Sequence, residues 1–137
     1  MTPANVLRLQ HVYRREYRSL LQYVREASPY AALADRPVRD GVMRIAKEEA
    51  TAIEAFGEWL EEHRLSLPYL GSFPVGFTDL NFVGIRHLLP KLIAEQKRDL
   101  QVLEADVSSF ADVVARAAVQ RLVDVHQRHL KELESLG

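Results

Sequence analysis

Five side chains that can bind metal ions fall on or beside the inward-facing rows of a sequence with a helical pattern. They are Glu16, Glu49, Glu95, His126 and His129. Ionised glutamates are rarely buried in a protein core unless they are paired or coordinate a metal. Carboxylate oxygens and imidazole nitrogens are ligands that zinc, iron and manganese accept from proteins. The set therefore indicates a metal site between packed helices.

The spacing of apolar residues places two of the glutamates inside. Glu16 lies between Tyr13 and Leu20 in one helical row. Glu49 follows Ile45 by four residues and shares its face. Residues three or four apart lie on the same side of a helix. Both carboxylates are therefore expected to point where the apolar stripe points.

The other three candidates come from the second half of the chain. His126 and His129 are three residues apart, a spacing that lets two imidazoles reach one ion. Glu95 lies at the margin of a broad apolar stripe, beside Leu92. Considered alone, Glu95 is better explained by surface exposure or an ion pair, and either histidine is better explained by an ordinary partly buried ring. The five together favour a shared site.

Four long helices must position these side chains, because the apolar residues recur with helical spacing and no alternating strand pattern occurs. Capping residues and prolines set the expected ends. The expected helices run up to Ser28, from Asp35 to about Arg64, from Thr78 to Val107, and from Ser108 or Ser109 to Leu136. The fold class is therefore expected to be all-α, with one domain over residues 1–137.

The segment Leu65–Phe77, LSLPYLGSFPVGF, predicts a long crossover between the second and third helices. Its 13 residues extend to roughly 45 Å, whereas a helix of about 27 residues is roughly 40 Å long. The connection can therefore return along a whole helix. The two helices it joins could then be parallel neighbours, in an up-down-down-up four-helix bundle.

Composition excludes several classes of partner. Of the 137 residues, 47% are hydrophobic and 27% charged, as in ordinary globular proteins, and the net charge is −1. We expect no nucleic acid partner, because the basic residues form no cluster, and no membrane partner, because no apolar run approaches about 20 residues. No signal peptide is evident, so a cytoplasmic location is expected. We expect a homo-oligomer formed through helix faces or the aromatic residues Tyr69, Phe73 and Phe77.

The chain resembles the ferritin-like superfamily, especially the bacterioferritin and rubrerythrin-like proteins, over nearly its whole length. EYRSLLQY, from Glu16 to Tyr23, is similar to the family segment in which a terminal glutamate precedes an inward tyrosine. IAKEEATAIEAF is similar to the family's E-x-x-H helix. DVHQRHLKEL resembles the second E-x-x-H, and Glu95 matches the lone glutamate of the third helix. The resemblance implies a ferritin-like bundle with a carboxylate-bridged di-iron site.

The chain departs from that motif at two positions. Ala52 stands where the first E-x-x-H has histidine, and His126 stands where the second has its bridging glutamate. The family implies four carboxylates, and the three present here leave an excess positive charge against two divalent ions. Ala50 stands where haem-binding members carry methionine, so no haem is expected. A standard di-iron centre is disfavoured.

Three alternatives follow from these departures. In the main interpretation, Glu95, His126 and His129, with Glu49 as a further ligand, bind one divalent ion of iron, zinc or manganese and support redox chemistry. In the second, the chain is a metal-free structural or interaction module that kept the fold and lost the site. In the third, a functional two-iron site remains. The residues do not decide whether the protein is an enzyme, and they indicate no catalytic residue or small-molecule substrate.

Overall fold

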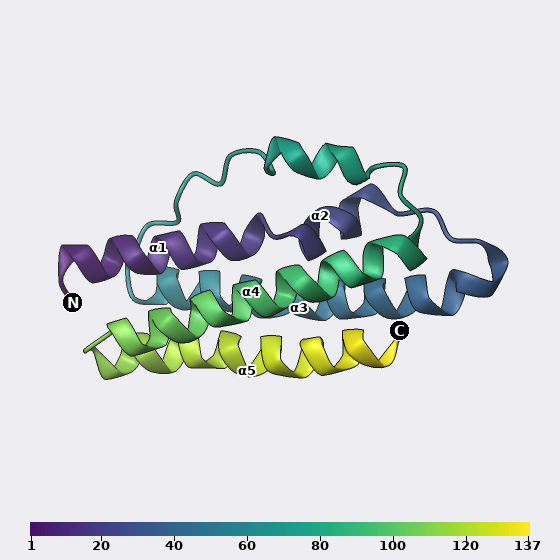
Figure 1. Ribbon diagram of the computed structural model, residues 1–137. Helices are drawn as coiled ribbons and strands as arrows, with labels where there is room; N and C mark the ends of the chain where they lie inside the picture. Colours follow the sequence, from purple (N-terminus) through teal and green to yellow (C-terminus); the bar gives the residue numbers. More distant parts are fainter.

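The computed structural model describes residues 1–137 and contains helices and no strands (Figure 1). The α-helices are α1 (Pro3–Tyr17), α2 (Leu20–Ala27), α3 (Arg36–Glu62), α4 (Ile85–Ser109) and α5 (Val113–Ser135). Two 3₁₀ helices, η1 (Leu33–Asp35) and η2 (Val75–Leu80), lie in the connections. The all-α prediction is confirmed. None of the helices combines the length and the apolar character needed to cross a membrane.

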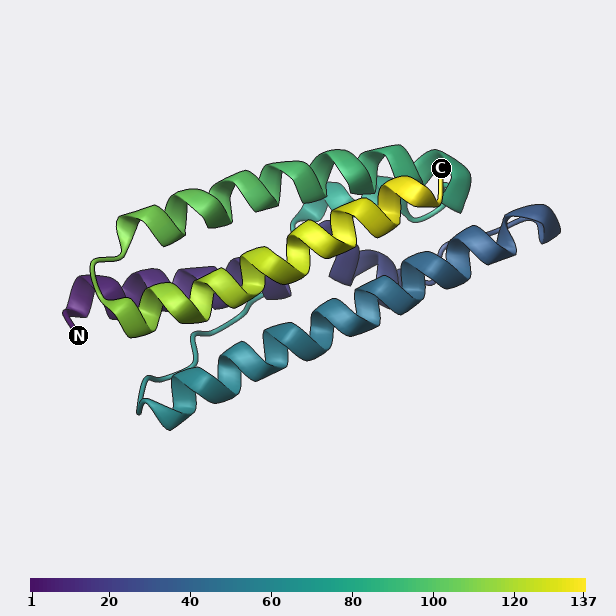
Figure 2. The same ribbon diagram turned by 90° about the horizontal axis from the view of Figure 1, so that it is seen from below.

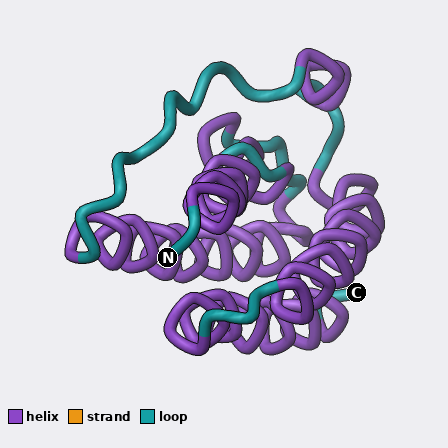
Figure 3. The backbone as a smooth tube through the Cα atoms, turned by 90° about the vertical axis from the view of Figure 1, so that its left-hand side faces the viewer, coloured by secondary structure: helices purple, strands orange, loops and turns teal.

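The long helices lie side by side with two directions of the chain. α1, α2 and α5 run one way and α3 and α4 run the other way (Figures 1 and 2). α5 packs along both α4 and α3, while α1 and α2 pack along α3. Residues 63–84 form the crossover, which passes outside the helices before α4 begins (Figure 3). α3 and α4 are parallel, as the crossover allows, but they contact each other little and are not the close neighbours we expected.

The first helix is broken where one continuous helix was predicted. α1 ends at Tyr17 and α2 begins at Leu20, after an extended Ser19. The Ser19 hydroxyl oxygen accepts a hydrogen bond from the backbone N–H of Gln22, at 3.3 Å. A serine cap of this kind satisfies a backbone donor that a helix start leaves unpaired. α1 and α2 nevertheless both pack on α3 with their buried residues.

α4, which corresponds to the third predicted helix, begins at Ile85 instead of near Thr78. The side chain of Thr78 bonds the carbonyl of Val75 within η2, at 2.7 Å, and so does not cap a helix. Gly84 is the residue before α4, and the N–H of Ile85 bonds the carbonyl oxygen of Tyr30 at 2.9 Å. Phe82, which lies within the predicted helix, is 99% exposed. The start of α4 is therefore set by the extended backbone of Gly84 and by the hydrogen bond from Ile85 to Tyr30.

α5, which corresponds to the fourth predicted helix, is capped at its N-terminus by Asp112 and not by Ser108 or Ser109. Both serine hydroxyls bond carbonyls of the preceding turn, so they belong to the end of α4. The carboxylate of Asp112 accepts from the N–H of Ala115 at 2.9 Å.

Replacing Asp112 with alanine should therefore lower the free energy of unfolding by about 1 kcal/mol, because the N–H of Ala115 loses its acceptor. Urea denaturation followed by circular dichroism measures this loss. Asp112→Asn is the matched control, since asparagine caps nearly as well and should lose little. Equal losses from both substitutions would contradict the capping role.

The apolar core is divided into two clusters. The first contains Leu9, Val12, Tyr13, Ile53, Phe56, Trp59, Leu60, Leu103 and Phe110 with apolar residues of the first half of α5. The second contains Leu20, Leu21, Val24, Val42, Ile45, Ala46, Ile85, Leu88, Leu89, Leu92 and Leu133. Along each of α3, α4 and α5, and across the join of α1 and α2, a buried polar residue lies between members of the two clusters. These polar residues form a layer across the middle of the core.

Candidate functional site

The polar layer consists of five side chains from four helices. α1 provides Glu16, α3 provides Glu49, α4 provides Gln96, and α5 provides His126 and His129. Their residue exposures are 2% or less. Each replaces an apolar residue in the inner row of its helix, which explains why all five point into the core.

His126 is at the centre of the layer. Its Nε2 lies 2.5 Å from Oε2 of Glu16 and 3.4 Å from Oε1 of Glu49. Its Nδ1 lies 3.1 Å from the amide nitrogen of Gln96. The same amide nitrogen donates to Oε1 of Glu49 at 2.8 Å. These four side chains therefore form one hydrogen-bonded network.

His129 joins this network at one edge. Its Nδ1 lies 3.3 Å from Oε1 of Glu49. Its Nε2 faces Oε2 of Glu48 at 3.4 Å, and the Glu48 side chain is 43% exposed. Two buried atoms of the layer have no hydrogen-bond partner: Oε2 of Glu49 and Nε2 of His129. The hydrogen bonds around His126 are thus complete, whereas Glu49 and His129 each keep one atom without a hydrogen-bond partner.

The carboxylates control the charge of the central ring. Burial by itself lowers the pKa of His126, but the nearby Glu16 and Glu49 outweigh it and raise that pKa from 6.5 to about 9. Burial tends to raise the pKa of Glu49, and His126 with the hydrogen bonds from His129 and Gln96 reverses this to a lowered pKa. The cluster therefore favours ionised Glu49 beside a protonated His126.

The amide of Gln96 links these two groups. With its nitrogen toward both Glu49 and His126, it matches a neutral ring whose Nδ1 accepts a hydrogen bond. A protonated ring donates from both nitrogens, so the amide oxygen must then face Nδ1. When the amide turns in this way, Gln96 loses its hydrogen bond to Glu49. The loss of that bond opposes the protonation of His126. The charge of His126 is therefore coupled to the orientation of Gln96.

Four of the five residues predicted from the sequence come together: Glu16, Glu49, His126 and His129. Glu95 does not join them, because it pairs with Arg98 at the surface of α4. Gln96 occupies the inward position instead, since it continues the buried row of Leu92 and Leu103. We missed Gln96 because glutamate is the stronger metal ligand. Its spacing, four residues after Leu92, was the available signal.

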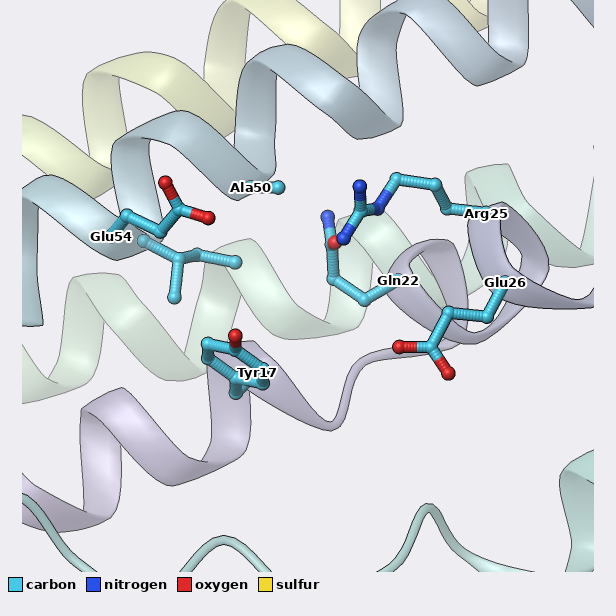
Figure 4. Close-up of a pocket in the computed structure, with 7 residues that line it drawn as sticks. Tyr17, Gln22, Arg25, Glu26, Ala50 and Glu54 are labelled. Atoms are coloured by element: carbon cyan, nitrogen blue, oxygen red, sulfur yellow. The ribbon is translucent and has the colours of Figure 1, made fainter.

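Two hollows lie near the layer, and none of the five layer residues lines either of them. One is lined by Tyr17 and Gln22, on the two sides of the break between α1 and α2, and by Ala50 and Glu54 of α3 (Figure 4). Its volume is about 10 Å³, which is close to the space for one water molecule. The other is a groove between α3 and α5 where Ala52, which provides no ligand, meets Trp59 and Leu122.

Comparisons of this chain with protein-family models, with curated proteins and with solved structures found no match. Its own residues therefore carry the functional argument.

The layer fits the implied di-iron centre poorly. No group of three or more histidine, aspartate or glutamate side chains is arranged so that it could hold a metal ion. Ligands bonded to one zinc-like ion at about 2.0–2.2 Å lie roughly 3.4 Å apart in tetrahedral geometry. The 2.5 Å contact between Glu16 and His126 is much shorter, so these two atoms cannot ligate the same ion as they stand. Ala52 and His126 also stand where the family motif has a histidine and a bridging glutamate, and Gln96 rather than Glu95 points inward.

Proposed function

We propose that this protein is a ferritin-like helical module in which a self-contained polar network has taken the place of the di-iron centre. The directions of the helices and the crossover between α3 and α4 support this fold assignment. So do Glu16, Glu49 and His129, which lie buried at matching places in the family motif. The proposed role is non-enzymatic: the layer ties four helices into one scaffold.

The hydrogen bonding of His126 is the observation that carries this proposal. Both ring nitrogens face side chains of the protein, Glu16 on one side and Gln96 on the other. Glu49 is likewise engaged by Gln96 and His129. Buried polar groups are tolerated when such partners satisfy them. The atoms that a metal would need are here partners of one another.

Metal titration of the purified protein tests this proposal. Anaerobic calorimetry with Fe²⁺, Mn²⁺ and Zn²⁺ should detect no site specific to the layer. The matched control replaces Glu16, Glu49, Gln96, His126 and His129 together by apolar residues of similar volume. Wild type and this variant should bind equally little metal. One ion per chain, bound by the wild type and lost in the variant, would overturn the proposal.

A second candidate function is the binding of a single divalent ion. The two unsatisfied buried atoms, Oε2 of Glu49 and Nε2 of His129, favour it, because unpaired polar atoms in a core are rare and need an explanation. Glu49 and His129 would then be the two ligands that the layer provides. The ion would add a Lewis acid to the core.

Under this second function, His129→Ala should abolish stoichiometric metal binding, because the variant loses one of the two main ligands. Glu16→Ala should reduce binding less, since position 52 offers no partner ligand beside it. Metal content after gentle purification measures both effects. Equal loss from the two substitutions would favour a two-metal arrangement instead.

Homo-oligomerisation remains a prediction. Of the three crossover aromatics expected at an interface, Tyr69 is 88% exposed. Phe73 and Phe77 pack on Tyr23, with ring centroids 5.3 and 5.6 Å apart. Tyr69 is therefore the most exposed of the three, and Phe73 and Phe77 are half-buried. Sedimentation equilibrium of the wild type would measure the oligomeric state.

A further inference from the structure

A polar cleft lies between α1, α4 and the crossover, on the outer side of the layer. Its volume is about 330 Å³, within the range of small-molecule sites. Four arginines line it, Arg14, Arg15, Arg18 and Arg98, together with the carboxylates of Glu95 and Asp99. The whole chain has a net charge of −1, yet the four arginines of this cleft face three carboxylates, those of Glu95 and Asp99 in its lining and that of Asp106, which pairs with Arg15. The cleft is therefore a local concentration of positive charge.

The crossover fixes two of these arginines. Nε of Arg14 donates to the carbonyl oxygen of Leu70 at 3.2 Å, and Nε of Arg18 donates to that of Ser72 at 2.7 Å. Each bond uses the inner N–H of the guanidinium group, and the terminal nitrogens make no other hydrogen bond within the chain. Arg14 and Arg18 are four residues apart, hence on one side of the chain at the end of α1. Two guanidinium groups are thus held in place with donors to spare.

Arg15 adds a donor without an acceptor. Its Nη2 bonds Asp106 at 2.5 Å, whereas its buried Nε has no hydrogen-bond partner. Buried donors are seldom left unpaired in proteins. Arg98, on the opposite wall, is paired with Glu95. Because the Nε of Arg15 is buried, the donors free to bind a ligand in the cleft are the terminal nitrogens of Arg14 and Arg18.

We propose that this cleft binds a small tetrahedral dianion, either inorganic phosphate or the phosphate group of a monoester. Guanidinium groups bind phosphate oxygens with paired, charge-assisted hydrogen bonds. Three arginines from one end of α1 and one from α4 converge on a cleft large enough for such a group. A nucleic acid would need a longer basic surface than this bounded cleft provides. The inference is independent of whether the layer binds metal.

Calorimetric titration with inorganic phosphate at constant pH and low salt tests the site. The wild type should bind one phosphate per chain, and sulfate should compete with it. Arg14→Gln combined with Arg18→Gln should weaken binding at least tenfold, because two fixed cations are lost. Arg128→Gln, at an exposed arginine of α5 that pairs with Glu132 at 3.8 Å, is the matched control and should change nothing. Equal weakening by the control would overturn the proposal.

A substitution that is expected to strengthen phosphate binding separates loss of the site from loss of the fold, because a misfolded variant would not bind more tightly. Glu95→Gln removes a negative charge from the cleft and frees Arg98, so phosphate should bind several-fold more tightly. Backbone NMR shifts of the wild type during titration should move in residues 11–20 and 70–77. Shifts spread over α5, or no saturable phosphate binding, would refute the site. Binding of a DNA oligonucleotide without binding of inorganic phosphate would refute it as well.

Discussion

Glu16→Ala is expected to lower the free energy of unfolding by about 3–5 kcal/mol, the loss typical of a buried charge that loses its partner. The carboxylate lies 2.5 Å from Nε2 of His126, and both side chains are buried. Alanine would leave the ring without its nearest acceptor and would open a cavity beside it. Urea denaturation at neutral pH measures the change. An accompanying loss of helical signal would show how far the damage spreads.

Two comparisons define what this loss means. Glu16→Gln keeps the volume and an acceptor oxygen and should lose less, while Glu61→Ala, at an exposed position of α3, should lose almost nothing. The variant with all five layer residues made apolar should be as stable as the wild type or more stable, because no buried charge remains unpaired. A Glu16→Ala loss below about 1 kcal/mol would contradict a buried ion pair, since even exposed pairs contribute up to about that much.

The stability of the protein should also fall as the pH rises from about 6.5 to about 9. The pKa of His126 is raised to about 9 in the folded state, against 6.5 for an unperturbed histidine. The folded state therefore holds a proton that the unfolded state releases, so the stabilisation is complete below pH 6.5 and is lost above pH 9. A shift of this size corresponds to roughly 3 kcal/mol. The turn of the Gln96 amide reduces it.

Denaturation midpoints at pH 6, 7.5 and 9 measure this dependence. His126→Gln should flatten the profile over that range, and His87→Gln, at an exposed position of α4, should leave it unchanged. Asp99 acts in a different pH range, because burial and the charge of Glu16 raise its pKa to about 6. The free energy of unfolding that Asp99 contributes therefore decreases as the pH rises from about 4 to about 6. A wild-type stability that stays constant from pH 6.5 to 9 would rule out a protonated His126.

Helical periodicity predicted most of the layer because it depends on the chain alone. Glu16, Glu49, His126 and His129 each continue an apolar row, and all four are buried. Periodicity could not separate Glu95 from Gln96, since the apolar stripe of α4 is broad and adjacent residues differ by only about 100° around a helix. Contact with α5 decides which of the two points inward. That information belongs to the packed structure.

The helix ends show a different limit. Ser19 and Gln22 form the S-x-x-Q signature of a helix start, but the apolar row continues past it and predicts one unbroken helix. Thr78 and Asp79 have good capping chemistry, yet both residues lie within η2, five or more residues before α4 begins. Local signals thus named possible starts in both places. Packing of the neighbouring segments decided which of them were used.

The polar layer also fixes the axial register of the helices. Slipping one helix by a single turn moves it about 5.4 Å relative to its neighbours. Such a slip of α1 would bring Tyr13 or Leu20, instead of Glu16, opposite His126 and leave a buried cation against hydrocarbon. Two purely apolar clusters joined end to end would resist that sliding far less, because one leucine packs much like another. A band of charge at mid-length makes one alignment of the helices strongly preferred.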